Sequence, residues 1–192
     1  FIGLDNYREL LADEYFWNAA FNTLSIGVIS AVPQLLLALL LAHMLNRPLR
    51  AQTVWRITLL LPNVTSVVAV VVIFSQLFGR DFGLINLILE LLGFERVNWQ
   101  GGVASSHIAI GVMIMWRWTG YNALIYLAAM QAVPRELYEA ATLDGASSLR
   151  QLRSITIPMI RPTIIFTVIV TTIGSMQIIA EPLRATGRPI GR

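Results

Sequence analysis

The stretch Pro134–Pro158, "PRELYEAATLDGASSLRQLRSITIP", decides the fold of this chain, because it is a short polar unit between two long apolar segments. Pro134 suits the first position of a helix, where its missing N–H costs nothing. Gly145 suits the left-handed residue that ends such a helix, and Ser147 suits the cap of a second one. The second helix repeats apolar residues at three-residue spacing: Leu149, Leu152 and Ile155. The stretch therefore predicts a helix–turn–helix.

Small residues and acids share the first of these two helices. Leu137, Ala140, Ala141 and Asp144 follow the i, i+3, i+4, i+7 rule, so we expect them on one face. The alanines would let another backbone approach closely. Glu139 lies too far into the helix for the helix dipole to explain it. It is either a solvated charge or a contact for a partner, and the alternative for the whole unit is a plain solvated hairpin.

Long apolar blocks lie on both sides of this stretch. A helix needs about 20 apolar residues to cross a bilayer, and four blocks satisfy this: about 23–45, 57–79, 103–130 and 163–180. Pro33 and Pro62 fall inside two of them, where proline usually marks a kink. We expect an all-α integral membrane protein, with a single transmembrane domain over residues 1–192 and the helix–turn–helix at 134–158.

The composition agrees with a membrane protein. Hydrophobic residues make up 56% of the chain and charged residues 13%, and the mean hydropathy is +0.66, whereas about a quarter of a soluble domain is charged. The net charge of +3 is carried by scattered Arg residues without any Lys. No basic stripe results, which argues against a nucleic-acid partner. The absence of Cys excludes disulfides and thiol nucleophiles.

The distribution of Arg predicts the orientation. The two connections on the side of the helix–turn–helix carry seven: Arg47, Arg50, Arg56, Arg135, Arg150, Arg153 and Arg161. The opposite side carries Arg8, Arg80 and Arg96, and the tail would add Arg184, Arg188 and Arg192 to it. Because cytoplasmic loops are enriched in basic residues, we expect the helix–turn–helix in the cytoplasm.

The segment "EAATLDGASSLRQLRSITIP" resembles the EAA loop of permease subunits from bacterial binding-protein-dependent ABC importers. That signature is Glu-Ala-Ala, three residues, Gly, nine residues, Ile, one residue and Leu-Pro. The matching positions here are Glu139 to Ala141, Gly145, Ile155 and Ile157-Pro158, with Ile in place of Leu. The flanks "LAAMQAVPRELYEAATLDGAS", "FIGLDNY" and "GSMQIIAEPLRATGRP" resemble the carbohydrate-uptake branch, although Arg188 departs from its usual Gly-Pro ending.

This resemblance implies a function and a set of partners. It implies a subunit of the bacterial inner membrane that assembles with a second permease, a dimer of cytoplasmic ABC ATPases and an extracytoplasmic sugar-binding protein. It also implies one further helix before these residues and one after them. The residues expected to dock the ATPase are Glu139, Ala140, Ala141, Asp144 and Gly145. The chain lacks a G-x-x-x-x-G-K-[ST] loop, so ATP chemistry is expected in the partner, with no cofactor in this chain.

Arg117 is the residue least suited to its predicted span. A charge at the centre of a membrane helix costs roughly 3 kcal/mol, so such a residue usually faces a bundle interior or a watery path. Tyr121, Asn122, Ser175 and Gln177 could add the hydrogen bonds and ring contacts that a sugar needs. We expect some of these residues to line the translocation path. The alternative is that Arg117 reaches the outer interface while the others pack helices.

Other function classes fit the sequence less well. An intramembrane enzyme or an ion-coupled secondary transporter would carry acidic or His clusters within the spans, and the predicted spans contain no acid. His43 and His107 stand alone near span ends, so no catalytic or metal site is predicted. Among ABC permeases, importers of glycerol phosphate, peptides or amino acids remain alternatives to a sugar importer.

Overall fold

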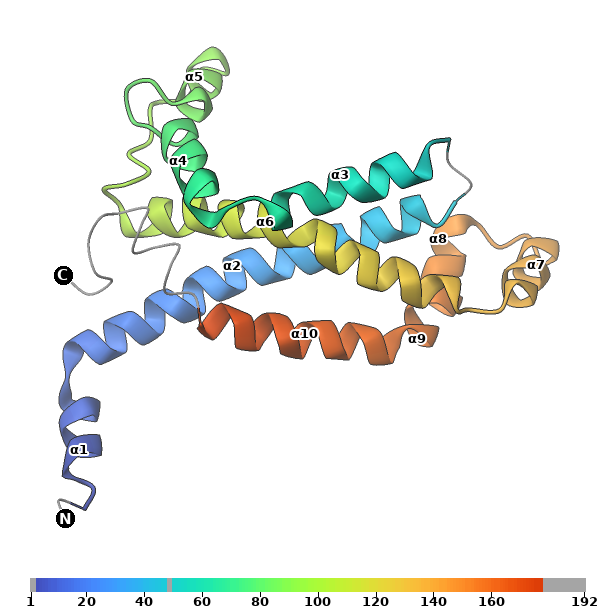
Figure 1. Cartoon of the computed structure of the whole chain (residues 1–192), viewed down its shortest axis with the longest axis horizontal. Helices are drawn as coiled ribbons and strands as arrows, with labels where there is room; N and C mark the ends of the chain where they lie inside the picture. The colour runs from blue at the N-terminus through green and yellow to red at the C-terminus, as the bar shows by residue number, and fades with distance from the viewer. Residues whose placement is uncertain (1–2, 48–49, 178–192) are drawn as a thin grey trace. The chain divides into compact units, whose positions relative to one another are not determined.

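The computed structural model of the chain describes residues 3–47 and 50–177, and within this part all regular structure is helical (Figure 1). The N-terminal helices are α1 (Asp5–Ala12), α2 (Glu14–Leu45), α3 (Gln52–Val64), α4 (Val67–Leu77) and α5 (Leu84–Leu91). They are followed by α6 (Val103–Gln131), α7 (Arg135–Leu143), α8 (Ser148–Gln151), the π-helix Leu152–Thr156, α9 (Ile157–Met159) and α10 (Arg161–Met176). The predicted fold class, all-α and of membrane type, is confirmed.

The first predicted span, 23–45, is the C-terminal part of a longer helix. Helix α2 has 32 residues, which corresponds to roughly 48 Å at 1.5 Å per residue. Pro33 lies inside α2 without ending it. In the part of the chain that the structure describes, α2 is the one helix that is long and apolar enough by itself to cross a membrane.

The second predicted span, 57–79, is broken into two helices in the structure. Helix α3 ends at Val64, and α4 begins at Val67. Ser66 between them has φ −53° and ψ 132°, which is extended backbone that a helix cannot continue through. The broken pairs α3–α4 and α8–α10 are each long and apolar enough if counted as one span, so the described residues hold up to three spans by this criterion.

The last two predicted spans each differ from a simple apolar helix. Helix α6 has 29 residues, which is long enough to cross a bilayer, but the polar stretch from Arg117 to Asn122 interrupts its apolar sequence. The predicted span 163–180 corresponds to α10, which ends at Met176, and residues 178–180 lie outside the described part.

The described residues divide into two compact units, each with its own core. The first unit comprises residues 3–30, 65–114 and 173–177, and the second comprises 31–47, 50–64 and 115–172. Helices α2, α6 and α10 each contribute residues to both units.

The core of the second unit depends on small residues. Ala38 and Ala42 of α2 and Ala123 of α6 are fully buried in one cluster with Tyr126 and Met130. Small side chains permit this close helix packing. The backbones of α3 and α6 approach each other even more closely at Gly120 of α6, because a Cβ atom there would overlap the carbonyl of Leu59 in α3.

A buried polar pair also joins α6 to α10 within the second unit. The hydroxyl of Tyr126 lies 2.6 Å from Oγ1 of Thr167. Both residues are about 1% exposed, so the buried hydroxyl of Tyr126 relies on Thr167 for its hydrogen bond. Thr167 additionally donates to the carbonyl of Ile164 at 2.9 Å.

In the first unit, Asn86 of α5 organises the chain between α4 and α6. Its Nδ2 donates to the carbonyls of Arg80 and Val97, both at 3.0 Å. Its Oδ1 accepts from the backbone N–H of Val97 at 3.1 Å and from Nε1 of Trp99 at 2.9 Å. Gly93, just after the end of α5, has φ +83°, the left-handed conformation typical of a residue that ends a helix.

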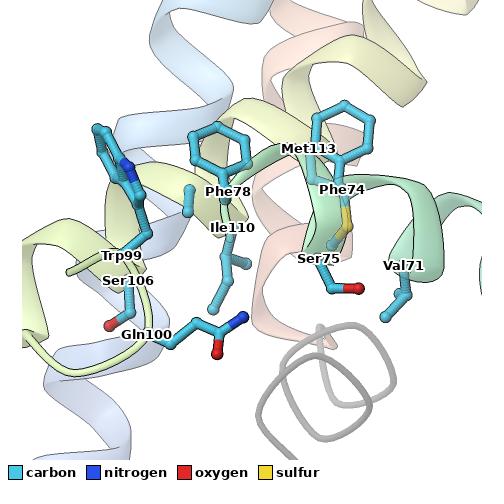
Figure 2. Close-up of a pocket in the computed structure, with 10 residues that line it drawn as sticks. Val71, Phe74, Ser75, Phe78, Trp99, Gln100, Ser106, Ile110 and Met113 are labelled. Atoms are coloured by element: carbon cyan, nitrogen blue, oxygen red, sulfur yellow. The ribbon is translucent and has the colours of Figure 1, made fainter. Parts of the chain in front are cut away.

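A small apolar cavity of about 50 Å³ lies beside this region in the first unit. Its walls come from α4, the segment before α6 and the first half of α6 (Figure 2). The rings of Phe78 and Trp99 meet edge to face at one end, with centroids 5.2 Å apart. Because aromatic side chains line it, we interpret this cavity as part of the side-chain packing of the first unit.

Candidate functional site

The hairpin formed by α7 and α8 turns at Gly145. The N–H of Ala146 donates to the carbonyl of Ala141 at 2.8 Å, and the N–H of Gly145 donates to that of Thr142 at 3.0 Å. These two bonds form a Schellman motif, and Gly145 has the left-handed φ of +73° that the motif requires. The predicted glycine cap is confirmed. A side chain at this position would have open space but a strained backbone.

The two hairpin helices begin differently, since α8 has a side-chain cap and α7 does not. Ser147 accepts a hydrogen bond from the N–H of Arg150 at 3.4 Å, which confirms it as the predicted cap of α8. Pro134 is the residue before α7 and has ψ 131°, so it lies one position earlier than predicted.

The second predicted helix differs from expectation, because α8 widens into a π-helix over Leu152–Thr156. Pro158 follows closely, has no N–H and would crowd the carbonyl four residues before it in an α-helix. A wider turn relieves this crowding. The predicted apolar row is accordingly broken: Leu152 and Ile155 pack against the core, whereas Leu149 is 56% exposed.

Side-chain hydrogen bonds brace the hairpin internally and join it to the π-helix that follows. The hydroxyl of Tyr138 lies 2.9 Å from Oγ1 of the buried Thr156. Nε2 of Gln151 donates to Oγ1 of Thr142 at 3.0 Å and to the carbonyl of Ala146 at 3.2 Å. These contacts link α7, the turn and α8, so the hairpin is a braced unit.

The end of α2 is joined to the same hairpin. Oγ of Ser148 lies 3.0 Å from Nε2 of His43 and accepts a hydrogen bond from Nη2 of Arg47 at 2.6 Å. These contacts tie the first residue of α8 to a helix more than 100 residues earlier in the chain. His43 therefore has a structural partner, which its sequence position did not indicate.

Four of the five residues predicted to dock a partner are exposed on the hairpin: Glu139, Ala140, Asp144 and Gly145. Ala141 is only partly exposed. Of the four residues expected on one face, Leu137, Ala140 and Asp144 are exposed and Ala141 is partly exposed. The outward face of α7 is formed by Glu136, Glu139, Ala140 and Leu143.

Leu143 is a residue that the sequence reasoning missed. Its side chain is 90% exposed at the end of α7, directly before the turn. Its i+4 spacing from Glu139 was the available signal, because residues four apart share a helix face. An apolar tip flanked by two acids and a small residue is suited to contact with a protein surface.

The residues predicted for a translocation path occupy different environments on α6. Nε and Nη1 of Arg117 are buried, and no hydrogen-bond acceptor for them is found among the described residues. Tyr121, one turn further along, is 42% exposed. Asn122 is 5% exposed and donates to the carbonyl of Trp118 at 3.3 Å in its own helix. Arg117 and Tyr121 share a side of α6 by their spacing, whereas Asn122 faces the packed side.

The other two predicted path residues belong to the first unit. Ser175 is partly exposed, and its Oγ would lie 3.0 Å from a Cβ added to Gly27. Gln177 is exposed, and its N–H donates to the carbonyl of Gly174 at 3.1 Å. Neither unit contains all five predicted residues.

No metal site stands out in the part of the chain that is described, since no group of three or more His, Asp or Glu side chains lies close enough to hold an ion. His107 lies in the first unit with its Nδ1 3.0 Å from Oγ of Ser25. Both histidines therefore have hydroxyl neighbours from other helices.

Comparison with known proteins places this arrangement among transport proteins. Residues 24–191 match the family model described as "Binding-protein-dependent transport system inner membrane component". The chain is 40% identical over 184 residues to the lactose transport system permease protein LacF of Rhizobium radiobacter, covering 94% of this chain and 61% of that protein. It is 35% identical over 178 residues to the trehalose/maltose transport system permease protein MalF of Thermococcus litoralis, covering 93% and 60%.

A solved structure shares the fold. The chain resembles, with a TM-score of 0.85 and 25% identity, a chain of a bacterial ABC transporter involved in the import of the acidic polysaccharide alginate. The match covers 100% of this chain and 68% of that one. The chain spans about three fifths of the length of the curated relatives it matches.

Proposed function

Because this chain belongs to the family of inner membrane components of binding-protein-dependent transport systems, we propose that it is part of the transmembrane subunit of an ATP-driven sugar importer in a bacterial inner membrane. Relatives named for lactose, trehalose/maltose and arabinooligosaccharide transport support a carbohydrate cargo. The subunit has no catalytic role of its own in this proposal. Its partners are a second permease, a pair of cytoplasmic ATPases and an extracytoplasmic sugar-binding protein.

The single observation that carries the mechanism is the braced hairpin with an exposed α7 face. A displacement is transmitted well by a rigid helix and poorly by a loose loop. The outward residues Glu139, Ala140 and Leu143 offer a charge, a flat patch and an apolar tip. In the proposed mechanism this face docks on the ATPase, and Asp144 and Gly145 complete the contact at the turn.

The inner attachments of the hairpin would convey that displacement to the membrane helices. Tyr138 connects α7 to Thr156, and Ser148 connects α8 to Arg47 at the end of α2. Motion of the docked hairpin would therefore reach α2 and, through the π-helix, α10. We propose that this hairpin lies in the cytoplasm, because the connections on its side of the membrane carry seven Arg residues. The connections on the opposite side carry three, or six if the C-terminal tail is included.

Two buried nitrogens of Arg117, Nε and Nη1, support a place on the translocation path. Buried polar atoms without a hydrogen-bond partner are costly, so we propose that an acceptor comes from the cargo, from water or from the second permease. Tyr121 lies on the same side of α6. Ser175 and Gln177 of the first unit are also proposed to line the translocation path. Asn122 is proposed to act indirectly, by stabilising α6.

A glycerol phosphate importer is the second candidate. The chain is 32% identical over 173 residues to the sn-glycerol-3-phosphate transport system permease protein UgpA of Yersinia pestis. A cationic side chain such as Arg117 is suited to a phosphate. A panel of labelled sugars and glycerol 3-phosphate in one uptake assay distinguishes the two cargo classes.

Replacement of the turn glycine tests the docking function. In the assembled transporter, Gly145→Asp should reduce both recovery of the ATPase with the permease and ATP-dependent uptake. Gly93→Asp is the matched control, since Gly93 also has positive φ and open space around its Cβ position, but lies outside the hairpin. Equal recovery and equal uptake for the two variants would refute the docking function.

A further inference from the structure

A polar cavity of about 710 Å³ lies behind the hairpin in the second unit. Its size is within the range of small-molecule sites, about 300–1,000 Å³. It lies between the end of α2, the end of α6 and the inner sides of α7 and α8. Its walls carry Arg47 and Arg135 together with amide and hydroxyl side chains.

The charge of this lining has one sign. Arg47 and Arg135 contribute guanidinium groups, and no Asp or Glu is among the lining residues. Within residues 3–47 and 50–177, the ion pairs are Arg8–Asp5 and Arg96–Glu90, so neither cavity arginine is neutralised there. Two arginines facing one polar space make it attractive to an anion.

The remaining polar lining is rich in hydrogen-bond donors. Amide groups come from Asn46, Gln52, Gln131 and Gln151, and hydroxyls come from Ser148, Tyr138 and Thr156. Nη2 of Arg47 donates a hydrogen bond to Ser148, and this bond fixes the guanidinium of Arg47 at the cavity wall. Arg135 makes no side-chain hydrogen bond within the described residues. Arginine donors in a planar fork match the oxygens of a phosphate group.

We propose that this cavity binds a phosphate-bearing anion through Arg47 and Arg135. Two sources share this chemistry: a free phosphate compound and the headgroup of an anionic phospholipid. The lipid source is reasonable because Arg47 follows the end of the predicted first span, where basic pockets meet headgroups. Both sources would be bound by residues of the cavity wall alone.

Binding there would connect the hairpin to the membrane helices. Arg47 follows α2, Arg135 begins α7 and Ser148 begins α8, so one anion would join three segments that otherwise meet through a few side-chain hydrogen bonds. This consequence rests on the proposed coupling role of the hairpin, but the binding itself does not. Binding is therefore measured separately from transport.

The test uses the full transporter purified in neutral detergent. Titration calorimetry with inorganic phosphate measures the free anion, with chloride as the ionic-strength control. Native mass spectrometry after reconstitution in phosphatidylcholine with and without phosphatidylglycerol measures retained anionic lipid. Arg135→Gln removes the charge without breaking a hydrogen bond seen in the described residues, Arg47→Gln removes the second charge, and Arg153→Gln is the control on the exposed side of the hairpin.

We expect binding in at least one of the two assays, weakened about tenfold or more by Arg135→Gln, as loss of a charge-assisted hydrogen bond predicts. Arg153→Gln should leave it unchanged. Binding of phosphate identifies a free anion, and retention of phosphatidylglycerol alone identifies the headgroup. The proposal is overturned if neither is bound, or if Arg135→Gln and Arg47→Gln bind as the unaltered protein does. In either of these cases the proposal fails even if sugar uptake is normal.

Discussion

The hydroxyl of Tyr138 in α7 lies 2.9 Å from Oγ1 of Thr156 in the π-helix, and Thr156 is 2% exposed. This contact sets the rotation of α7, because it turns Tyr138 inward and therefore turns Glu139, Ala140 and Leu143 outward. A tertiary contact within the second unit thus decides which face the hairpin presents.

Removing that contact should loosen the hairpin without unfolding the chain. A single hydrogen bond of this kind contributes about 0.5–1.5 kcal/mol, and Thr156 keeps a longer bond to the carbonyl of Gln151 at 3.4 Å. We expect Tyr138→Phe to speed amide hydrogen exchange in α7 several-fold and to lower the sugar transported per ATP hydrolysed. Thr156→Val combined with Tyr138→Phe should cause less than the sum of the two single effects. Strict additivity would show that the two hydroxyls do not act together.

A methyl group at Gly120 should destabilise the second unit. The carbonyl of Leu59 occupies the position of the added Cβ, so α3 and α6 would have to separate, and overpacking of this kind costs about 1–3 kcal/mol. Thermal unfolding of Gly120→Ala in detergent should therefore occur at a lower temperature than in the unaltered protein. Gly174→Ala is the control, because no atom lies within 4 Å of its Cβ position in α10. Equal unfolding temperatures for both variants would contradict the close contact.

The guanidinium of Arg117 should matter for transport, whereas Asn122 should matter for the stability of α6. We expect Arg117→Leu to reduce sugar uptake tenfold or more while the transporter still assembles, since a charge-assisted contact is worth about 1.5–3 kcal/mol. Asn122→Ala should alter uptake less than Arg117→Leu and leave the choice of cargo unchanged. Normal uptake by Arg117→Leu, with unchanged cargo preference, would remove Arg117 from the path.

The loop after α5 should respond to acid. Arg96 donates to Glu90 from Nε at 2.5 Å and from Nη2 at 3.1 Å, and these hydrogen bonds lower the pKa of Glu90. A carboxyl with a depressed pKa stabilises the fold above its unfolded pKa, near 4.5, and this stabilisation is lost as the pH falls through the lower folded pKa. Amide exchange around residues 90–97, corrected for its intrinsic pH dependence, should therefore rise below about pH 4.5.

Glu90→Gln provides the control for that experiment, since it removes the titrating group at nearly constant size. Its corrected exchange should be faster at neutral pH and should lack the acid-induced rise. A similar rise in Glu90→Gln would assign the pH dependence to another group.

The sequence predicted the parts of the hairpin that local chemistry determines. Gly145 is needed for a left-handed turn and Ser147 for a cap, and neither role depends on distant residues. The break at Ser66 was missed, because the apolar composition of 57–79 continues across it. The exposed face of α7 and the inward orientation of Asn122 were also missed, since these depend on packing against residues far along the chain.

Site-specific cross-linking can show whether the outward face of α7 contacts the ATPase, as we propose. These 192 residues contain no Cys, so a benzophenone maleimide can be attached at Leu143→Cys alone. The matched control is Phe82→Cys, which is 99% exposed but lies in the loop before α5. After irradiation of the assembled transporter, we predict a cross-link to the ATPase from position 143 and none from position 82. Absence of the first cross-link from an intact complex, or equal cross-linking from both positions, would contradict the account.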